Sequence, residues 1–255
     1  MKNVVRIVLL AVFAFSAISV SANAHGKKLR VLFVLTSHSE LGTTGKPTGF
    51  WIEEFATPYY FLKDRGVEVV VASPKGGQAP IDPKSNEPAF QTASTKRYFA
   101  DADAQKVISN TVKLSTIVTN KYDAVFYSGG HGPMWDLAED PNSIRVIQEF
   151  YYSKKPIAFV CHGSAALVNV KDVNGKYIID GKRLTGFCNS EEMAVQLTQV
   201  VPFSLEDKLR ECGGLYEKGA DWSSFVVEDG QLITGQNPQS SEQVAQRLYE
   251  RLTGK

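Results

Sequence analysis

The most constraining feature of this 255-residue sequence is a cysteine-histidine pair at the junction of two patterns. Cys161 and His162 follow the apolar run 156–160 (Pro-Ile-Ala-Phe-Val) and precede a Gly-Ser-Ala-Ala segment. The run predicts a buried parallel strand, and the small residues predict the first turn of a helix, so Cys161 falls on a sharp strand-to-helix corner. We expect the helix N-terminus at this corner to lower the pKa of the thiol and favour the thiolate.

The rest of the chain alternates strand and helix patterns, which predicts an α/β fold around a mostly parallel sheet. Apolar runs predict further strands at 29–36, 67–72 and 124–128, and an Asp-Gly turn predicts a hairpin within 225–234. Helical spacing or capping residues predict helices at 48–65, from 140 onwards, from 204 to 212 and at 240–252. The segment 74–88 is expected to be a long surface loop, and 170–185 a small antiparallel excursion.

The N-terminus has the pattern of a secretory signal peptide. Lys2 and Arg6 precede an apolar stretch at 7–14, and Ala22-Asn23-Ala24 offers small residues for cleavage before His25. We therefore predict a signal peptide at 1–24, one folded domain at 25–255 and an exported, periplasmic or secreted protein. An uncleaved anchor helix is the alternative, but the stretch 7–20 is interrupted by serines and is shorter than the roughly 20 residues that a membrane span needs.

Charge and cysteine content exclude some classes of protein. A formal net charge of +1 creates no field to attract nucleic acid or to hold the mature chain on a membrane. The three cysteines cannot all pair within one chain, and Cys161 is the simplest free thiol. Cys188 and Cys212 are either a disulfide or two separate buried thiols, and we favour the second interpretation.

A glycine-rich loop follows the strand at 124–128. In parallel sheets the carboxyl ends of neighbouring strands meet at one edge, so Gly129, Gly130 and His131 are expected to lie near Cys161. Glycines let backbone amides approach a reacting oxygen, which favours an oxyanion or substrate-binding role for this loop, with the His162 amide as a second donor. The alternative is a tight turn without a catalytic role.

The candidate base is His162 or His131, because the chain has no histidine beyond the elbow. That absence disfavours a papain-like protease or a class I amidotransferase mechanism, in which the catalytic histidine lies well downstream of the cysteine. Glu191 or Glu192 is expected to orient the base, unless both acids only complement a helix dipole. Glu54, half buried in the first helix, is expected to be protonated and to donate a hydrogen bond to the Cys161 sulfur.

Five motifs in sequence order resemble the PfpI superfamily, and the match is closest to its heat-shock chaperone branch with glutathione-independent glyoxalase (glyoxalase III) activity. They are Thr48-Gly49 through Glu54 to Pro58, Ser-Gly-Gly-His-Gly at 128–132, Ala-Phe-Val-Cys-His-Gly at 158–163, Leu-Thr-Gly-Phe at 184–187 with Glu192, and Thr-Gly-Gln-Asn-Pro at 234–238. The resemblance implies a flavodoxin-like three-layer sandwich with a nucleophile elbow, related to the class I glutamine amidotransferase-like domain and commonly dimeric. It also implies Cys161 as nucleophile, His162 as base, Glu192 as orienting acid and Glu54 as partner of the thiol.

The same resemblance implies conversion of methylglyoxal to lactate without a cofactor or metal, or removal of early carbonyl adducts from glycated proteins. Two alternatives are a cysteine amidase or peptidase, and a protein without enzymatic activity that acts as a stress holdase or a thiol redox sensor. Metal binding by His38, His131 and an acid near Glu54 is a further alternative that their spacing does not require.

Overall fold

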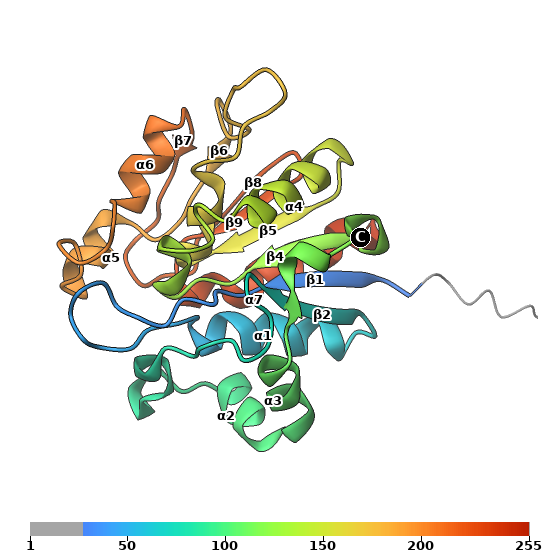
Figure 1. The fold of residues 1–255 in the computed structure, drawn as a ribbon, viewed down its shortest axis with the longest axis vertical. Helices are drawn as coiled ribbons and strands as arrows, with labels where there is room; N and C mark the ends of the chain where they lie inside the picture. The colour runs from blue at the N-terminus through green and yellow to red at the C-terminus, as the bar shows by residue number, and fades with distance from the viewer. Residues whose placement is uncertain (1–27, 255) are drawn as a thin grey trace, which may run out of the picture.

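The computed structural model describes residues 28–254, which form an α/β fold around a seven-stranded sheet (Figure 1). The strand order is β3-β2-β1-β4-β5-β9-β8, and only the β8–β9 pair is antiparallel. The strands are β1 (Arg30–Val34), β2 (Glu68–Ser73), β3 (Val112–Lys113), β4 (Ala124–Tyr127), β5 (Ile157–Val160), β8 (Val226–Asp229) and β9 (Leu232–Gly235). The predicted α/β class with a mostly parallel sheet is confirmed.

Helices cover both faces of this sheet, which makes the molecule three layers thick (Figure 1). Helices α1 and α7 pack together on one face, while α4 packs on β4 and β5 from the other. The helices are α1 (Ile52–Lys63), α2 (Ala93–Ala100), α3 (Ala102–Ser109), α4 (Pro141–Tyr152), α5 (Asn189–Ala194), α6 (Leu205–Glu211) and α7 (Ser241–Thr253). Among the described residues, none of the helices combines the length and the apolar character needed to cross a membrane.

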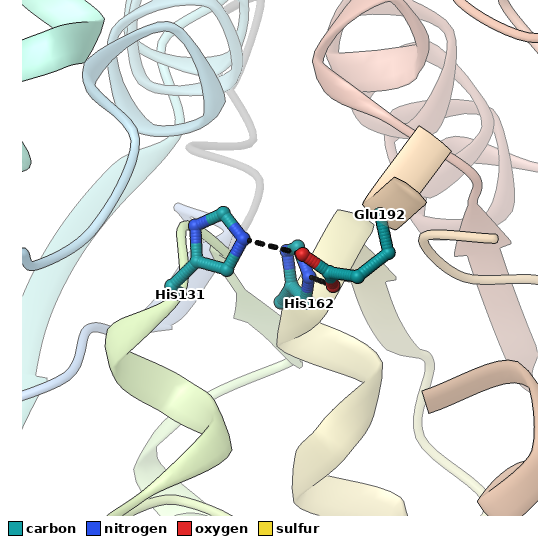
Figure 2. Close-up of side chains that lie close together, drawn as sticks. All are labelled: His131, His162 and Glu192. Carbon is teal, nitrogen blue, oxygen red and sulfur yellow. Dashed lines mark hydrogen bonds and ion pairs between the residues drawn. The ribbon is translucent and has the colours of Figure 1, made fainter. Parts of the chain in front are cut away.

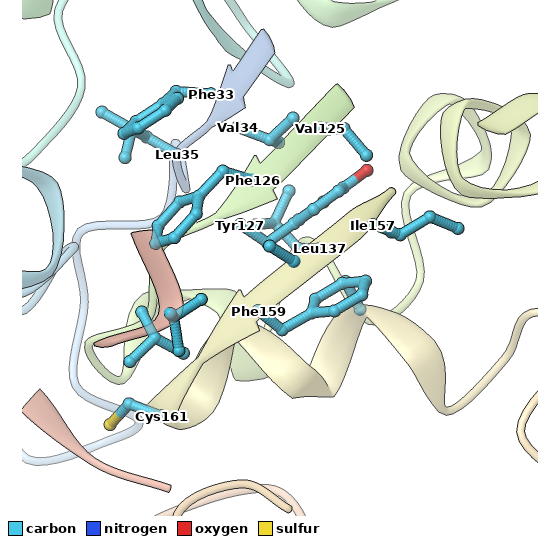
Figure 3. Close-up of a cluster of buried hydrophobic side chains, with 14 of the residues drawn as sticks. Phe33, Val34, Leu35, Val125, Phe126, Tyr127, Leu137, Ile157, Phe159 and Cys161 are labelled. Carbon is cyan, nitrogen blue, oxygen red and sulfur yellow. The ribbon is translucent and has the colours of Figure 1, made fainter. Parts of the chain in front are cut away.

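Aromatic pairs in strand register build the core on each face. Phe33 of β1 lies opposite Phe126 of β4, and their rings stack with centroids 4.7 Å apart on the side of α1. Tyr127 lies opposite Phe159 of β5, and these rings stack at 5.0 Å on the side of α4 (Figure 3). Strands β1, β4 and β5 are buried on both faces and their sequences are apolar, apart from Arg30 at the start of β1, as expected for central parallel strands.

Three local expectations differ from the structure. The first helix begins at Ile52 rather than near residue 48, because the backbone of Phe50 instead bonds to the loop at Pro80 and Asp82. The segment after Cys161 is a 3-10 helix, η6 (Cys161–Leu167), and not an α-helix. The predicted loop at 74–88 is supported by isolated bridges and contains the 3-10 turn η1 (Pro83–Asn86), followed by η2 (Pro88–Phe90).

The excursion at 170–185 is antiparallel only in part. Its turn brings Lys171 and Tyr177 into a single antiparallel bridge. The next extended residues, β6 (Arg183–Leu184), pair in parallel with β7 (Leu215–Tyr216), about 30 residues further along. A partner so distant in sequence leaves no local signal in the excursion itself. The predicted signal peptide at 1–24 lies outside the described residues.

Candidate active site

Cys161 occupies a strained corner at the end of β5 (Figure 3). Its φ is +57°, in the left-handed region that residues with a side chain rarely adopt. Such strain persists where the surrounding structure imposes it, and it concentrates at functional sites. The corner depends on Gly163, because a Cβ there would lie 2.6 Å from the carbonyl oxygen of Tyr127. The elbow predicted from the sequence is therefore present.

His162 connects the thiol to a carboxylate. Its Nδ1 lies 3.3 Å from Cys161 Sγ, and its Nε2 lies 2.7 Å from Glu192 Oε2. Burial opposes ionisation of Glu192, but His162 and His131 outweigh it and hold the pKa of this carboxyl well below its usual range. An ionised Glu192 accepts the Nε2–H hydrogen of His162, so Nδ1 carries the free lone pair that faces the sulfur.

His131 shares the same carboxylate. Its Nε2 lies 3.0 Å from Glu192 Oε1, and its ring centroid is 4.2 Å from that of His162. Figure 2 shows the Glu192 carboxylate reaching both imidazoles. Burial and the neighbouring His131 lower the pKa of His162, against the attraction of Glu192. His162 is therefore neutral near pH 7 and able to accept a proton.

Glu54 lies beneath the thiol, within α1. It is fully buried, its Oε2 accepts a 2.7 Å hydrogen bond from the Gly129 amide, and Oε1 has no hydrogen-bond partner among the described residues. Burial raises the pKa of Glu54 to about 8, against hydrogen bonds from Cys161 and Gly129. The carboxyl group is consequently protonated near neutral pH, as the sequence analysis expected, although it is fully rather than half buried.

Cys161 was expected to have a lowered pKa and to be a thiolate, but the structure indicates the opposite. Burial and then Glu54 raise the pKa of the thiol well above its usual range, while the His162 amide lowers it. The side chain is only 3% exposed, and the short 3-10 helix after it lacks the longer dipole on which the expectation relied. The resting group is therefore a thiol, and His162 is placed to remove its proton.

The two glycine amides in the loop after β4 have different surroundings. The Gly129 amide donates to Glu54, so it is not free for the oxyanion role predicted for it. The Gly130 amide has no acceptor among the described residues, and Gly130 lines the cavity beside Cys161. A Cβ on Gly130 would lie 2.4 Å from the Trp51 amide nitrogen, which explains the need for glycine at this position.

A cavity of about 650 Å³ opens above the thiol. Four residues predicted for the site line this cavity: Cys161, His162, His131 and Glu54. Glu192 does not line it, but its carboxylate contacts the two histidines that do. The sequence analysis missed most of the other residues that line the cavity. The apolar and aromatic ones include Leu41, Trp51, Phe90, Phe187, Val195, Leu197 and Trp222, and the charged ones are Lys46, Glu53, Asp82, Lys84 and Glu87.

Glu191 points away from Cys161 and His162, so of the two adjacent acids it is Glu192 that contacts the candidate base. Its Oε1 accepts hydrogen bonds from the Trp222 amide and the Asn237 side chain, both at 2.8 Å, and its Oε2 lies 3.2 Å from Cys188 Sγ. Glu191 was expected from the sequence only as the alternative to Glu192, and Asn237 was not assigned a function, although it lies within the motif at 234–238.

The remaining cysteines and His38 have separate surroundings. Cys188 and Cys212 are free buried thiols, and Cys212 Sγ donates to the Val168 carbonyl. Within residues 28–254, two groups place potential metal ligands within 4.8 Å of one another: His131-His162-Glu192 and Cys188-Glu191-Asp221. His38 belongs to neither, because it stacks on Trp135 and bonds to the Glu40 carbonyl.

The sequence and the structure of the chain are similar to those of known proteins. Residues 48–251 match the sequence profile of the DJ-1/PfpI family. Glyoxalase 3 of Candida albicans is 30% identical over 227 residues, which cover 86% of this chain and 96% of that protein. The crystal structure of glyoxalase III from the same organism superposes with a TM-score of 0.81 at 29% identity, over 88% of this chain and 97% of the other. Rapid Encystment Protein 24 kDa of Francisella tularensis is 40% identical with a TM-score of 0.85, over 88% and 99% of the two chains.

Proposed function

The chain belongs to the DJ-1/PfpI family, and from this premise we propose that it is a cofactor-independent, glutathione-independent glyoxalase that converts 2-oxoaldehydes such as methylglyoxal to 2-hydroxy acids. The observation that carries the proposal is the position of the His162 ring, with Nδ1 3.3 Å from Cys161 Sγ and Nε2 2.7 Å from an ionised Glu192. Relatives named as glutathione-independent glyoxalases in yeasts support the choice of substrate class.

The first step forms a hemithioacetal. Cys161 Sγ attacks the aldehyde carbon, the C=O π electrons move to oxygen, and the thiol proton passes to His162 Nδ1. The free Gly130 amide and the His162 amide stabilise the developing oxyanion. The resulting imidazolium is stabilised by Glu192, which already accepts the Nε2–H hydrogen. A neutral Glu54 leaves no second negative charge beside the reacting sulfur.

The second step moves a proton between adjacent carbons. The imidazolium returns its proton to the oxyanion. The neutral Nδ1 then removes the proton from the hemithioacetal carbon, and the C–H electron pair moves through the new C=C bond to the former ketone oxygen, which gives an enediolate. His162 returns that proton to the neighbouring carbon, and the hydroxyl proton of the hemithioacetal passes to the neighbouring oxygen, which leaves the thioester of a 2-hydroxy acid. Water then cleaves the C–S bond, and the thiol is restored. The net reaction adds one water to the dicarbonyl, so no external oxidant or reductant is needed.

The test is lactate formation from methylglyoxal by residues 25–255 in the absence of glutathione. We expect turnover in the wild type and a loss of roughly 10³-fold or more in Cys161→Ala, because no other group replaces the nucleophile. Glu192→Gln is expected to lose on the order of 10²–10⁴-fold, because an amide has no charge to stabilise the imidazolium and has only one oxygen to accept from the two histidines. The matched control is Cys212→Ala, which removes a buried thiol outside the cavity and should retain turnover.

Folded wild-type protein that produces no lactate would contradict the proposal. Cleavage of amide substrates by that protein, lost in Cys161→Ala, would instead identify a cysteine amidase that uses the same pair.

A further inference from the structure

The cavity is several times larger than a three-carbon substrate. Methylglyoxal has only five non-hydrogen atoms, whereas about 650 Å³ has room for roughly 20 water molecules at about 30 Å³ each. Cavities of this size ordinarily enclose ligands several times larger. Most of the apolar wall would therefore remain without contact in a complex with methylglyoxal.

Trp222 forms part of this wall in an unfavourable backbone conformation. Its φ is +60°, although it carries one of the largest side chains, and the residue is 41% exposed. Its ring packs edge-to-face on Phe187, with the ring centroids 5.8 Å apart. The centroid of the Phe187 ring lies 4.3 Å from that of the His162 imidazole. The aromatic surface therefore continues from the reacting atoms outwards, and local strain is retained where it places Trp222 on that surface.

Two fully buried polar residues hold Trp222 in place. Glu191 Oε1 accepts the Trp222 amide hydrogen at 2.8 Å, and Asn237 donates to both Glu191 Oε1 and the Ser223 carbonyl, at 2.8 Å and 2.9 Å. Next to Asn237, Gln236 accepts a hydrogen bond from the Gly219 amide at 2.9 Å. Burying such groups costs free energy, and each of the three makes one of its side-chain hydrogen bonds to the loop 219–225 that carries Trp222.

The same contacts show what the Thr-Gly-Gln-Asn-Pro motif at 234–238 does in the structure: it connects β9 to the loop 219–225. Its first residues end β9, which lies parallel to β5 with Gly235 opposite Val160. Gln236 and Asn237 therefore emerge at the edge of the sheet where Cys161 lies, and they fix the loop 219–225 against that edge. A second aromatic pair, Trp51 and Phe90 with centroids 5.2 Å apart, also lines the cavity.

We propose that Trp222 is a specificity-determining residue that selects 2-oxoaldehydes with a large apolar substituent, aryl or long alkyl, over methylglyoxal. The inference rests on the proposed function, because it specifies the substrate of the same site. The aldehyde carbon lies at Cys161, and the substituent extends past Phe187 to pack on the Trp222 ring. Glu191 and Asn237 are positioning residues that act through Trp222.

The kinetic test compares methylglyoxal, 2-oxohexanal and phenylglyoxal as substrates. We expect kcat/KM to rise by roughly fourfold for each methylene that is buried, mainly through a lower KM. In Trp222→Gly the preference for phenylglyoxal over methylglyoxal, measured as the ratio of the two kcat/KM values, should fall by roughly tenfold. Glycine suits the left-handed backbone, so this variant removes the ring without adding strain. Trp222→Phe should keep most of the preference.

The matched control is Trp135→Ala, which removes a tryptophan that stacks on His38 and lies outside the cavity. It should leave the ratio of the two kcat/KM values unchanged. A ratio that is equally unchanged in Trp222→Gly, or a kcat/KM that does not rise along the series, would overturn the inference.

A binding experiment separates this inference from the proposed function. In Cys161→Ala, which cannot form the hemithioacetal, calorimetry measures the affinities of mandelate and lactate, the hydroxy acids expected from phenylglyoxal and methylglyoxal. We expect mandelate to bind at least about tenfold more tightly, and expect Trp222→Gly in the same background to abolish the difference. Equal affinities for the two acids would overturn the inference, even if the wild type proves to be a glyoxalase.

Discussion

At the scale of single residues, the site limits how many charges it buries at once. Cys161, His162 and Glu54 are all neutral in the resting state near pH 7, whereas Glu192 is ionised. Several ionised side chains in so small a buried space would cost more than their contacts return. The reactive ion pair of sulfur and imidazolium is therefore expected to form only as the substrate is attacked.

The raised pKa of Glu54 predicts a specific dependence of stability on pH. Between about 4.5 and about 8 the folded protein keeps a proton that the unfolded chain releases, so the free energy of unfolding falls as pH rises through this window. The slope from one such group is at most about 1.4 kcal/mol per pH unit. Glu54→Gln removes the titrating group, so its stability relative to the wild type should increase from pH 5 to pH 8 in urea unfolding experiments.

Glu192 has the opposite effect and acts in a different window. Its lowered pKa stabilises the fold above the usual glutamate pKa of 4.5, and this contribution is lost as pH falls below that value. It therefore does not obscure the effect of Glu54 between pH 5 and pH 8. Parallel stability curves for the wild type and Glu54→Gln across that range would contradict the prediction.

At the scale of elements, residues that are consecutive in a short segment contact different parts of the site. Glu191 and Glu192 are consecutive in α5, about 100° apart around the helix, so one holds the Trp222 loop and the other reaches the histidines. The loop after β4 works similarly: Gly129 donates to Glu54, whereas Gly130 leaves its amide free. Each division depends on two elements being packed together, and not on either segment alone.

The packing of the glycine loop on α1 can be tested with a pair of substitutions. Gly130 and Gly175 both have positive φ, at +84° and +79°, but only Gly130 has backbone atoms within 3 Å of the position of an added Cβ. Gly175→Ala should cost about 1–2 kcal/mol of stability, from backbone strain alone. Gly130→Ala should cost more and also reduce kcat, because the loop must move away from Trp51 and takes the Gly130 amide with it.

Thermal unfolding and methylglyoxal turnover measure these two effects. Equal losses of stability in the two variants, with full activity in Gly130→Ala, would show that the loop has room to adjust and that its close approach to α1 is not required.

At the scale of the whole molecule, the residues of the candidate active site meet because four parallel strands end at one edge of the sheet. The segments after β1, β4, β5 and β9 all emerge there, and the histidines, the elbow and the Gln236-Asn237 pair come from three of them. This is the position at which α/β sheets generally bind ligands. The chain adds Glu192 and Trp222 to this edge from the region between β5 and β8.

We further propose that the whole chain is exported and that residues 1–24 are removed. Expression in a bacterial host should give periplasmic protein whose mass corresponds to a chain starting at His25. Ala24→Leu should block cleavage, because the peptidase requires a small residue at that position, whereas Asn23→Leu at the neighbouring position should not. Cytoplasmic protein that retains its full N-terminal segment would contradict the proposal.

Much of the fold follows from local patterns. The apolar runs predicted β1, β2, β4 and β5 to within one or two residues, and Asp140-Pro141 predicted the start of α4, where Asp140 caps the helix. The Asp-Gly turn predicted the β8–β9 hairpin. These features depend on residues close together in sequence, so periodicity and capping chemistry suffice to predict them.

The sequence by itself also determined which residues would gather at the sheet edge, because parallel strands must place their carboxyl ends together. Only the tertiary structure decided what each one does there: that Glu192 and not Glu191 faces His162, that the Gly129 amide is taken by Glu54, and that Cys161 rests as a thiol. The strained Trp222 was likewise outside the reach of pattern analysis. Side-chain direction, burial and pKa depend on segments far apart in the chain, and their combined effect is defined only once those segments are packed.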